Sequence, residues 1–177
     1  MKIIGLAGSN SHQSINKKLV TYASSLFREN ETELLDLNDF EVELYRPDRE
    51  ELNGIPRKIS DLASKISNAD LIILSLAEHN SSYNASFKNT LDWLSRIPNR
   101  KVFDNTSMLL MATSPGARGG KSVLESAEAT FPRMAANLKG IFSLPSFNEN
   151  FDTEKGIITD IEKDSELKEI IYKIVNG

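Results

Sequence analysis

The sequence predicts a doubly wound α/β domain built around a parallel sheet. Short runs rich in apolar and β-branched residues alternate with segments of helical periodicity, which is the pattern of strands joined by crossover helices. The run Leu71–Leu76 is almost entirely apolar, as expected for a strand covered by helices on both faces. The length of 177 residues suits one domain with a core of its own.

Five short runs are predicted as strands because they are apolar and are bounded by turn-forming residues. In chain order they are Lys2–Ala7, Glu33–Asp36, Leu71–Leu76, Ser107–Thr113 and Gly140–Leu144. Five further segments are predicted as helices because apolar residues recur every three or four positions. These are Ser14–Arg28, Arg57–Asn68, Ser86–Arg96, Ser122–Lys139 with an interruption at Pro132, and Ser165–Val175. The breakers Pro47, Gly54 and Pro56 predict irregular structure over Asp39–Pro56.

Five strands and five helices predict a flavodoxin-like three-layer sandwich with a five-stranded parallel sheet. Its order, 2-1-3-4-5, is not read from the sequence itself but suits this length better than a six-stranded dinucleotide domain. Residues 1–177 are expected to form this single domain, which leaves no room for a separate dinucleotide-binding domain. In such sheets ligands bind at the carboxyl ends of the strands, beside the reversal in strand order. The loops after strands one, three and four are therefore where a binding site is expected.

Composition excludes several classes of function. The chain has no cysteine, so disulfides, thiolate metal sites and cysteine nucleophiles are ruled out, and no metal site is expected. A net charge of −4 argues against a general nucleic-acid binder. The longest apolar stretch, near Leu71–Ala77, is far shorter than the roughly 20 residues of a membrane span. We therefore expect a cytoplasmic protein with no membrane or nucleic-acid partner.

The loop after the first strand is rich in hydroxyl and amide side chains. It runs from Gly8 to Asn16 with the sequence GSNSHQSIN, and Gly8 permits a close turn into the helix. Together with the helix N-terminus, these donors could surround a phosphate group. The segment contains neither GxxxxGK[ST] nor GxGxxG, so it is not a standard nucleotide loop. An ordinary helix cap by Ser11 or Ser14 is the alternative.

The other two loops are also unusual. Residues 77–85, AEHNSSYNA, follow the most buried strand and expose backbone groups that could bind the edge of a heteroaromatic ring. Residues 114–120, SPGARGG, hold three glycines that can turn N–H groups toward a ligand, with Arg118 as a nearby cation. The alternatives are a solvated connection for the first of these loops and a flexible turn for the second.

Together the three loops resemble the NADPH-dependent FMN reductase family. GSNSHQSIN is similar to that family's GSxRxxSxN phosphate loop. AEHNSSYNASFKNTLDWLSR is similar to its PEYNxSxPGxLKNxxDWxSR segment, and SPGARGG to its SPGxxGG segment. The matches come in the right order and cover nearly the whole chain.

The resemblance implies an FMN site made by all three loops. It implies no obligatory catalytic side chain, because hydride transfer to a flavin needs none. His79 could protonate an acceptor, but a structural hydrogen bond explains it better, so it is not assigned a catalytic role. The residues implied to bind the cofactor are Ser9, Ser11, Ser14, Ile15 and Asn16 of the first loop, Glu78, His79, Asn80, Ser81 and Ser82 of the second, and Ser114, Pro115, Gly116 and Gly119 of the third.

Three departures from the family pattern bear on this site. Ser11 stands where the family has Arg, which removes a charge-assisted phosphate contact that His12 or Lys17 could partly replace. His79 stands where the family has Tyr, beside Ala77 in place of Pro. Asn84 replaces a Pro, so that turn is less rigid.

The resemblance also implies the activity. FMN would take hydride from NADPH or NADH and pass it to a small-molecule acceptor such as a quinone, azo compound or free flavin, in ping-pong exchange at one site. Backbone N–H groups of residues 114–120 and of the following helix would stabilise the reduced flavin. A homodimer or homotetramer is implied, with Trp93, Leu94 and the loop 39–56 as interface elements. The alternatives are a flavodoxin-type electron carrier, which is usually more acidic than this chain, and a non-catalytic flavin-binding protein.

Overall fold

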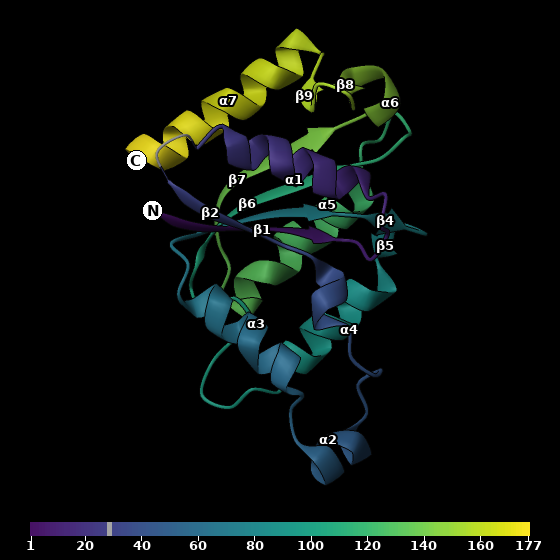
Figure 1. The fold of residues 1–177 in the computed structure, drawn as a ribbon, viewed down its shortest axis with the longest axis vertical. Coiled ribbons are helices and arrows are strands. Elements are labelled where there is room, and N and C mark those ends of the chain that lie inside the picture. Colours follow the sequence, from purple (N-terminus) through teal and green to yellow (C-terminus); the bar gives the residue numbers. More distant parts are fainter. Residues whose placement is uncertain (28–29) are drawn as a thin grey trace.

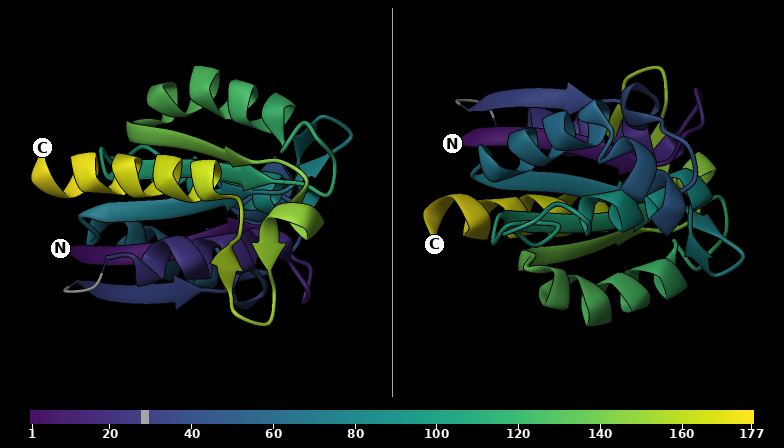
Figure 2. Two further views of the ribbon diagram at one scale, coloured as in Figure 1. Left: turned by 90° about the horizontal axis from the view of Figure 1, so that it is seen from above. Right: turned by 90° about the horizontal axis from the view of Figure 1, so that it is seen from below.

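The computed structural model describes residues 1–27 and 30–177 and contains a five-stranded parallel sheet (Figure 1). The sheet order is β2-β1-β3-β6-β7, which confirms the predicted order 2-1-3-4-5. The strands are β1 (Lys2–Gly8), β2 (Glu31–Leu35), β3 (Leu71–Leu76), β6 (Ser107–Thr113) and β7 (Asn137–Leu144). The strands point the same way, so their carboxyl ends and the loops that follow them gather at one edge (Figure 2).

Helices cover both faces of the sheet and make two apolar cores. On one face, α1 (Ile15–Ser25) and α7 (Ile161–Asn176) pack over alternate strand residues such as Ile73 and Leu109. On the other face lie α3 (Arg57–Ser67), α4 (Ala85–Leu94) and α5 (Lys121–Thr130). All six residues of β3 are buried, because both of its faces are covered.

The five predicted helices are present, but their bounds differ in the structure, most of all for the first and the fourth. The first begins at Ile15, after the N-cap residue Ser14, and ends at Ser25; the predicted end, Arg28, lies outside the described residues. The prediction of helix over Ser122–Lys139 is wrong at its C-terminal end. Helix α5 stops at Thr130, a 3-10 turn η2 (Phe131–Met134) contains Pro132, and residues 137–139 belong to β7. Asn137 pairs with Ser107, so β7 begins at a residue that was predicted to be helical.

Several short elements are absent from the sequence-based prediction. The structure adds the 3-10 helix η1 (Leu37–Phe40), helices α2 (Pro47–Asn53) and α6 (Phe147–Asn150), and two hairpins, β4 (Glu78–His79) with β5 (Ser82–Tyr83) and β8 (Phe151–Asp152) with β9 (Ile157–Ile158). The last helix, α7, also begins four residues before the predicted Ser165, because Asp160 caps its N-terminus. The added 3-10 helix, the two added helices and the hairpin strands are too short to produce a periodic pattern.

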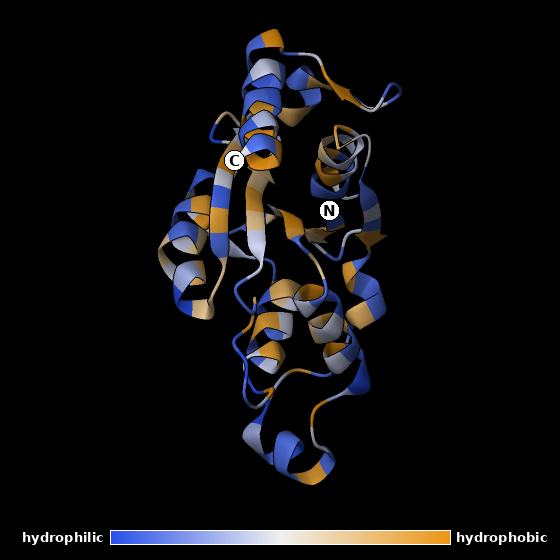
Figure 3. Cartoon of the chain, turned by 90° about the vertical axis from the view of Figure 1, so that its left-hand side faces the viewer, coloured by the Kyte–Doolittle hydropathy of each residue, from blue (hydrophilic) through white to orange (hydrophobic). Residues whose placement is uncertain are grey.

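The segment 39–56, predicted to be irregular, forms a projecting arm that contains α2. No residue of α2 is buried, and Leu52 is 83% exposed in an otherwise hydrophilic helix at the end of the molecule opposite α7 (Figure 3). The base of the arm is held by α4. The Trp93 indole Nε1 donates to the Glu43 carbonyl at 2.8 Å, and the Asn89 carboxamide accepts from the Tyr45 N–H at 2.8 Å. Trp93 itself is 2% exposed and belongs to the core of this chain.

A buried carboxamide joins α1 to two strands at the carboxyl edge of the sheet. The Asn16 Oδ1 atom accepts hydrogen bonds from the Ser75 hydroxyl at 2.7 Å and from the Thr113 N–H at 3.1 Å. Its Nδ2 atom donates to the Thr113 carbonyl at 3.3 Å. Asn16 is 2% exposed, so these bonds are shielded from water. They fix the start of α1 relative to the ends of β3 and β6.

The loop after β6 is fixed to the segment that follows β7. Gly119 has a φ of 58°, and a Cβ atom there would lie 2.3 Å from the Ser143 hydroxyl oxygen. That hydroxyl donates to the Gly119 carbonyl at 2.9 Å. The carbonyls of Ser114 and Gly116 accept from the N–H groups of Phe147 and Ser146, each at 3.0 Å. The loop therefore has a defined shape.

Replacing Asn16 by Ala should destabilise the protein by about 2–4 kcal/mol, because it leaves the buried Ser75 hydroxyl and Thr113 N–H without their acceptor. Urea unfolding measures this as a lower midpoint with an unchanged slope. The control is Asn176→Ala in an exposed position, which should change stability by less than about 0.5 kcal/mol. Equal stability of the two variants would contradict the assignment of the buried network.

Replacing Gly119 by Ala should destabilise the protein by about 1–3 kcal/mol, since it forces a side chain into the left-handed region and against Ser143. The matched control is Gly116→Ala in the same loop. A Cβ at Gly116 meets no atom within 4 Å, and its φ is not positive, so the cost should stay below about 0.5 kcal/mol. Thermal unfolding of both variants checks this; a more damaging change at Gly116 would refute it.

Candidate functional site

The loops after β1, β3 and β6 meet around a cavity of about 210 Å³ at the carboxyl edge of the sheet. This is the edge at which the fold places its ligands. The predicted site residues that line the cavity are Ser9, Ser11, Ser14, Ile15, Asn16, Glu78, His79, Ser114 and Pro115. Asn80, Ser81, Ser82, Gly116 and Gly119 do not line it; the first three belong to the exposed end of the β4–β5 hairpin, and Gly119 is buried against Ser143.

Three serines of the first loop line the cavity and accept hydrogen bonds from backbone N–H groups. The hydroxyl oxygens of Ser9, Ser11 and Ser14 accept from the backbone N–H groups of Ser11, Gln13 and Lys17, at 3.2–3.3 Å. Each hydroxyl uses an oxygen lone pair in this way and keeps its proton for another acceptor. The N-terminus of α1 lies at the same place and adds its free N–H groups. This donor set suits a phosphate group.

Asn16 contributes to the site in a different way from the serines. Its side chain is committed to Ser75 and Thr113, so its role is to hold the loop in position. The sequence motif alone does not separate these two roles. Three residues that sequence reasoning missed also line the cavity, namely Gln13, Ala77 and Thr113. Thr113 is the last residue of β6 and Ala77 directly follows β3, and that position at the carboxyl ends of the strands was the available signal.

The β4–β5 hairpin carries His79 on the rim of the cavity. Its two-residue turn, Asn80 and Ser81, adopts left-handed φ values of 51° and 62°. Asn84, which replaces a family Pro, caps α4 by accepting from the N–H groups of Ser86 and Phe87. The Asn84 Nδ2 atom also donates to the Asn10 Oδ1 at 2.9 Å and lies 3.4 Å from the His79 Nε2. Asn84 thus connects the first and second loops.

The third loop offers fewer free N–H groups than the sequence led us to expect. The N–H groups of Gly119 and Lys121 donate to the carbonyls of Gly116 and Arg118. The N–H of Val123, in the first turn of α5, donates to the Glu78 carboxylate at 3.1 Å. Arg118 is exposed and donates to the Ser122 hydroxyl at 2.5 Å. The contribution of this loop to a ligand therefore falls to residues 114–118.

The cavity has an unusual charge. Glu78 is the one residue with a formal charge among the described residues that line it, and neither Lys nor Arg is among them. Its lining otherwise consists of neutral donors and a few apolar groups, Ile15, Ala77 and Pro115. Such a lining fits FMN, which has a phosphate at one end and a flat, largely apolar ring at the other. With Ser11 in place of the family's Arg, a phosphate in this cavity would meet neutral donors and the helix dipole.

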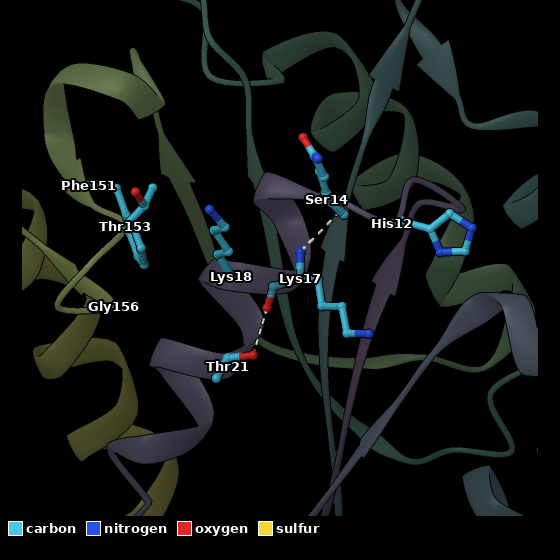
Figure 4. Close-up of a pocket in the computed structure, with 9 residues that line it drawn as sticks. His12, Ser14, Lys17, Lys18, Thr21, Phe151, Thr153 and Gly156 are labelled. Atoms are coloured by element: carbon cyan, nitrogen blue, oxygen red, sulfur yellow. Dashed lines mark hydrogen bonds between the residues drawn. The ribbon is translucent and has the colours of Figure 1, made fainter.

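A second cavity, of about 300 Å³, lies beside the first, between α1 and the β8–β9 hairpin (Figure 4). His12, Lys17 and Lys18 line it, and the two lysines leave α1 on opposite sides. Lys17 is paired with Asp36 at 2.5 Å, and this hydrogen bond holds the pKa of the Asp36 carboxyl below its usual value. Lys17 is therefore bound to Asp36, which follows β2, and does not replace the missing arginine.

Two wider properties of the described chain bear on function. Residues 1–27 and 30–177 include no helix that is long and apolar enough to cross a membrane. Within the same ranges, no three His, Asp or Glu side chains gather as ligands for a metal ion.

Known proteins share both the sequence and the fold. The family model described as NADPH-dependent FMN reductase matches residues 1–149. An uncharacterised protein from Mycoplasma pneumoniae is 31% identical over 88% of this chain and 93% of its own. An NADPH:quinone oxidoreductase from Arabidopsis thaliana is 27% identical over 98% of this chain and 90% of its own.

The fold recurs in a solved flavoenzyme. FerB, an NAD(P)H:acceptor oxidoreductase from Paracoccus denitrificans, superposes with a TM-score of 0.77 over 98% of this chain and 95% of its own, at 21% identity. The flavodoxin-like architecture, the motifs in the three loops and the match over residues 1–149 agree. The chain therefore belongs to the NADPH-dependent FMN reductase family and is an NAD(P)H-dependent oxidoreductase.

Proposed function

We propose that this protein binds FMN in the cavity at the carboxyl edge of the sheet and uses it to reduce a small acceptor with NADPH or NADH. The observation that supports this most directly is the convergence of the three motif-bearing loops on one cavity lined by neutral donors. Quinones, azo compounds and free flavin are the acceptor classes we expect, and the Arabidopsis relative is named for a quinone.

When bound, FMN accepts hydride from the nicotinamide and gives electrons to the acceptor. The protein would bind and orient the cofactor. The hydroxyls of Ser9, Ser11 and Ser14 and the α1 N-terminus would hold the phosphate. Residues 77–79 and 114–115 would contact the ring, since they line the other part of the cavity. Hydride transfer requires no side-chain acid or base, so no residue is assigned that role.

We also propose that the nicotinamide and the acceptor use the same place in turn, in a ping-pong sequence. The chain contains no GxGxxG fingerprint that would mark a separate dinucleotide site. A single cavity reached by both substrates accounts for this. We expect a cytoplasmic location, where NAD(P)H is supplied.

A homodimer or homotetramer is part of the proposal, with the arm 39–56 as the contact. The arm exposes Leu44 by 68% and Leu52 by 83%, which favours a contact with another chain. Trp93 and Leu94 are each 2% exposed, so they would support the arm from below and not touch the partner directly. A solution mass equal to one chain would contradict this assignment.

The visible spectrum of the purified protein with added FMN, followed by anaerobic titration with each nicotinamide, tests the function. We expect FMN to bind and its absorbance to be bleached directly by NADPH or NADH. Bleaching that requires a separate reductase would favour an electron carrier. Failure to take up FMN would favour a non-catalytic binding protein and overturn the proposal.

The neutral phosphate site predicts a particular salt dependence. Because no Lys or Arg lines the cavity within the described chain, FMN affinity should change little between low and high ionic strength. Ser11→Arg restores a charged donor and should tighten FMN binding about tenfold at low salt, with the gain shrinking as salt rises.

The matched control is Ser11→Gln, which adds length without charge and should leave the salt dependence flat. Fluorescence titration of FMN at several salt concentrations measures all three proteins. A wild-type affinity that falls steeply with salt would contradict the neutral site.

A further inference from the structure

Glu78 reaches across from the β4–β5 hairpin to the first turn of α5. Its Oε2 atom accepts the Val123 N–H at 3.1 Å, although the two residues are 45 positions apart. Helix α5 has Gly120 as its N-cap, which lacks a side chain and adopts a φ of 78°. The helix therefore receives from Glu78 the acceptor that an N-cap side chain normally supplies.

The second strand of the hairpin is attached to the C-terminal end of the same helix. Tyr83, which pairs with Glu78 in the hairpin, has its hydroxyl 3.1 Å from the Thr130 Oγ1. Its ring stacks on Phe131 with centroids 5.9 Å apart. The hairpin is thus fixed to both ends of α5, and the Glu78 attachment is the one that lies at the cavity.

The charge of Glu78 matters because of its position. Glu78 is the one formally charged residue among those that line the cavity in the part of the chain that the structure describes. Reduction of a flavin adds negative charge to the ring system, and a nearby carboxylate disfavours that change. The N-terminus of α5, whose Val123 N–H the carboxylate accepts, offsets part of this effect.

We propose that Glu78 is a positioning residue that joins the second and third loops through α5 and whose charge makes bound FMN harder to reduce. The consequence is a flavin biased toward giving electrons to the acceptor and against taking them from the nicotinamide. The charge effect rests on the proposed function, since it requires FMN in this cavity; the connection between the loops does not.

Two variants separate the hydrogen bond from the charge. Glu78→Gln keeps an oxygen acceptor for the Val123 N–H and removes the charge, whereas Glu78→Ala removes both. The control is Glu128→Gln, which removes a carboxylate from an exposed position of the same helix, two turns from its start. None of these changes alters the apolar core.

The first measurement uses the protein without FMN. Amide exchange of Val123 should be about fivefold faster in Glu78→Ala, the equivalent of one lost helix cap, and close to the wild-type rate in Glu78→Gln and Glu128→Gln. Unchanged exchange in Glu78→Ala would overturn the connection. If Glu78→Ala does not fold, thermal unfolding of Glu78→Gln still decides. This variant keeps an oxygen acceptor for the Val123 N–H, so only a slight loss of stability is expected. A large loss of stability would overturn the role of the acceptor.

The second measurement is the midpoint potential of bound FMN, which a merely structural role would not move. Glu78→Gln should raise the preference for reduced over oxidised FMN about tenfold, or about 30 mV for a two-electron couple, with no change in Glu128→Gln. The anaerobic rate of reduction by the nicotinamide should rise, and the rate of reoxidation by a quinone should fall. An unchanged potential in Glu78→Gln would overturn the charge effect.

The two measurements distinguish failure of this inference from failure of the proposed function. If the wild-type protein does not bind FMN, the proposed function and the charge effect fall together. The exchange of the Val123 amide would still decide whether Glu78 connects the hairpin to α5.

Discussion

The buried carboxamide of Asn16 is the interaction on which the geometry of the site depends. It makes hydrogen bonds to the N–H and carbonyl groups of Thr113 at the end of β6 and to the Ser75 hydroxyl of β3. These bonds use both polar atoms of the carboxamide, and only 2% of Asn16 is exposed. Buried polar groups of this kind are costly unless every bond is made, so they permit a single arrangement of the elements they join. Ser9, Ser11 and Ser14, proposed to hold the phosphate, precede Asn16 in the same loop, and their position relative to the two other loops follows from it.

The strands could be predicted because they depend on local and simple patterns, whereas their order was taken from the fold class. Leu71–Leu76 and Ser107–Thr113 match the structure residue for residue, since apolar runs between turn signals leave little choice. The β4–β5 hairpin could not be predicted, because its two-residue strands are polar and obtain their stability from α5. Residues 137–139 were placed in a helix because their strand character comes from pairing with β6, which a single segment does not reveal.

The candidate site shows the same division. Of the residues that the sequence predicts at the site, Ser9, Ser11, Ser14 and Glu78 line one cavity. What the sequence could not supply was the use each side chain makes of its atoms. In the sequence Asn16 resembles a ligand-binding residue, but its side chain is bonded to two strands. Glu78 resembles a flavin contact, but its carboxylate caps a helix. Lys17 resembles a substitute for the missing arginine, but it is paired with Asp36. These are pairings between distant segments, and they become visible only in three dimensions.

The way the arm is attached has a consequence for how this protein can change over evolutionary time. Trp93 and Asn89 hold the arm through the backbone atoms of Val42, Glu43 and Tyr45, and backbone atoms are present whatever the side chains are. The outward residues of α2 can therefore drift in sequence without loosening the arm or disturbing the cavity. A surface with that freedom can acquire or lose recognition of other chains while the redox chemistry beneath it stays the same.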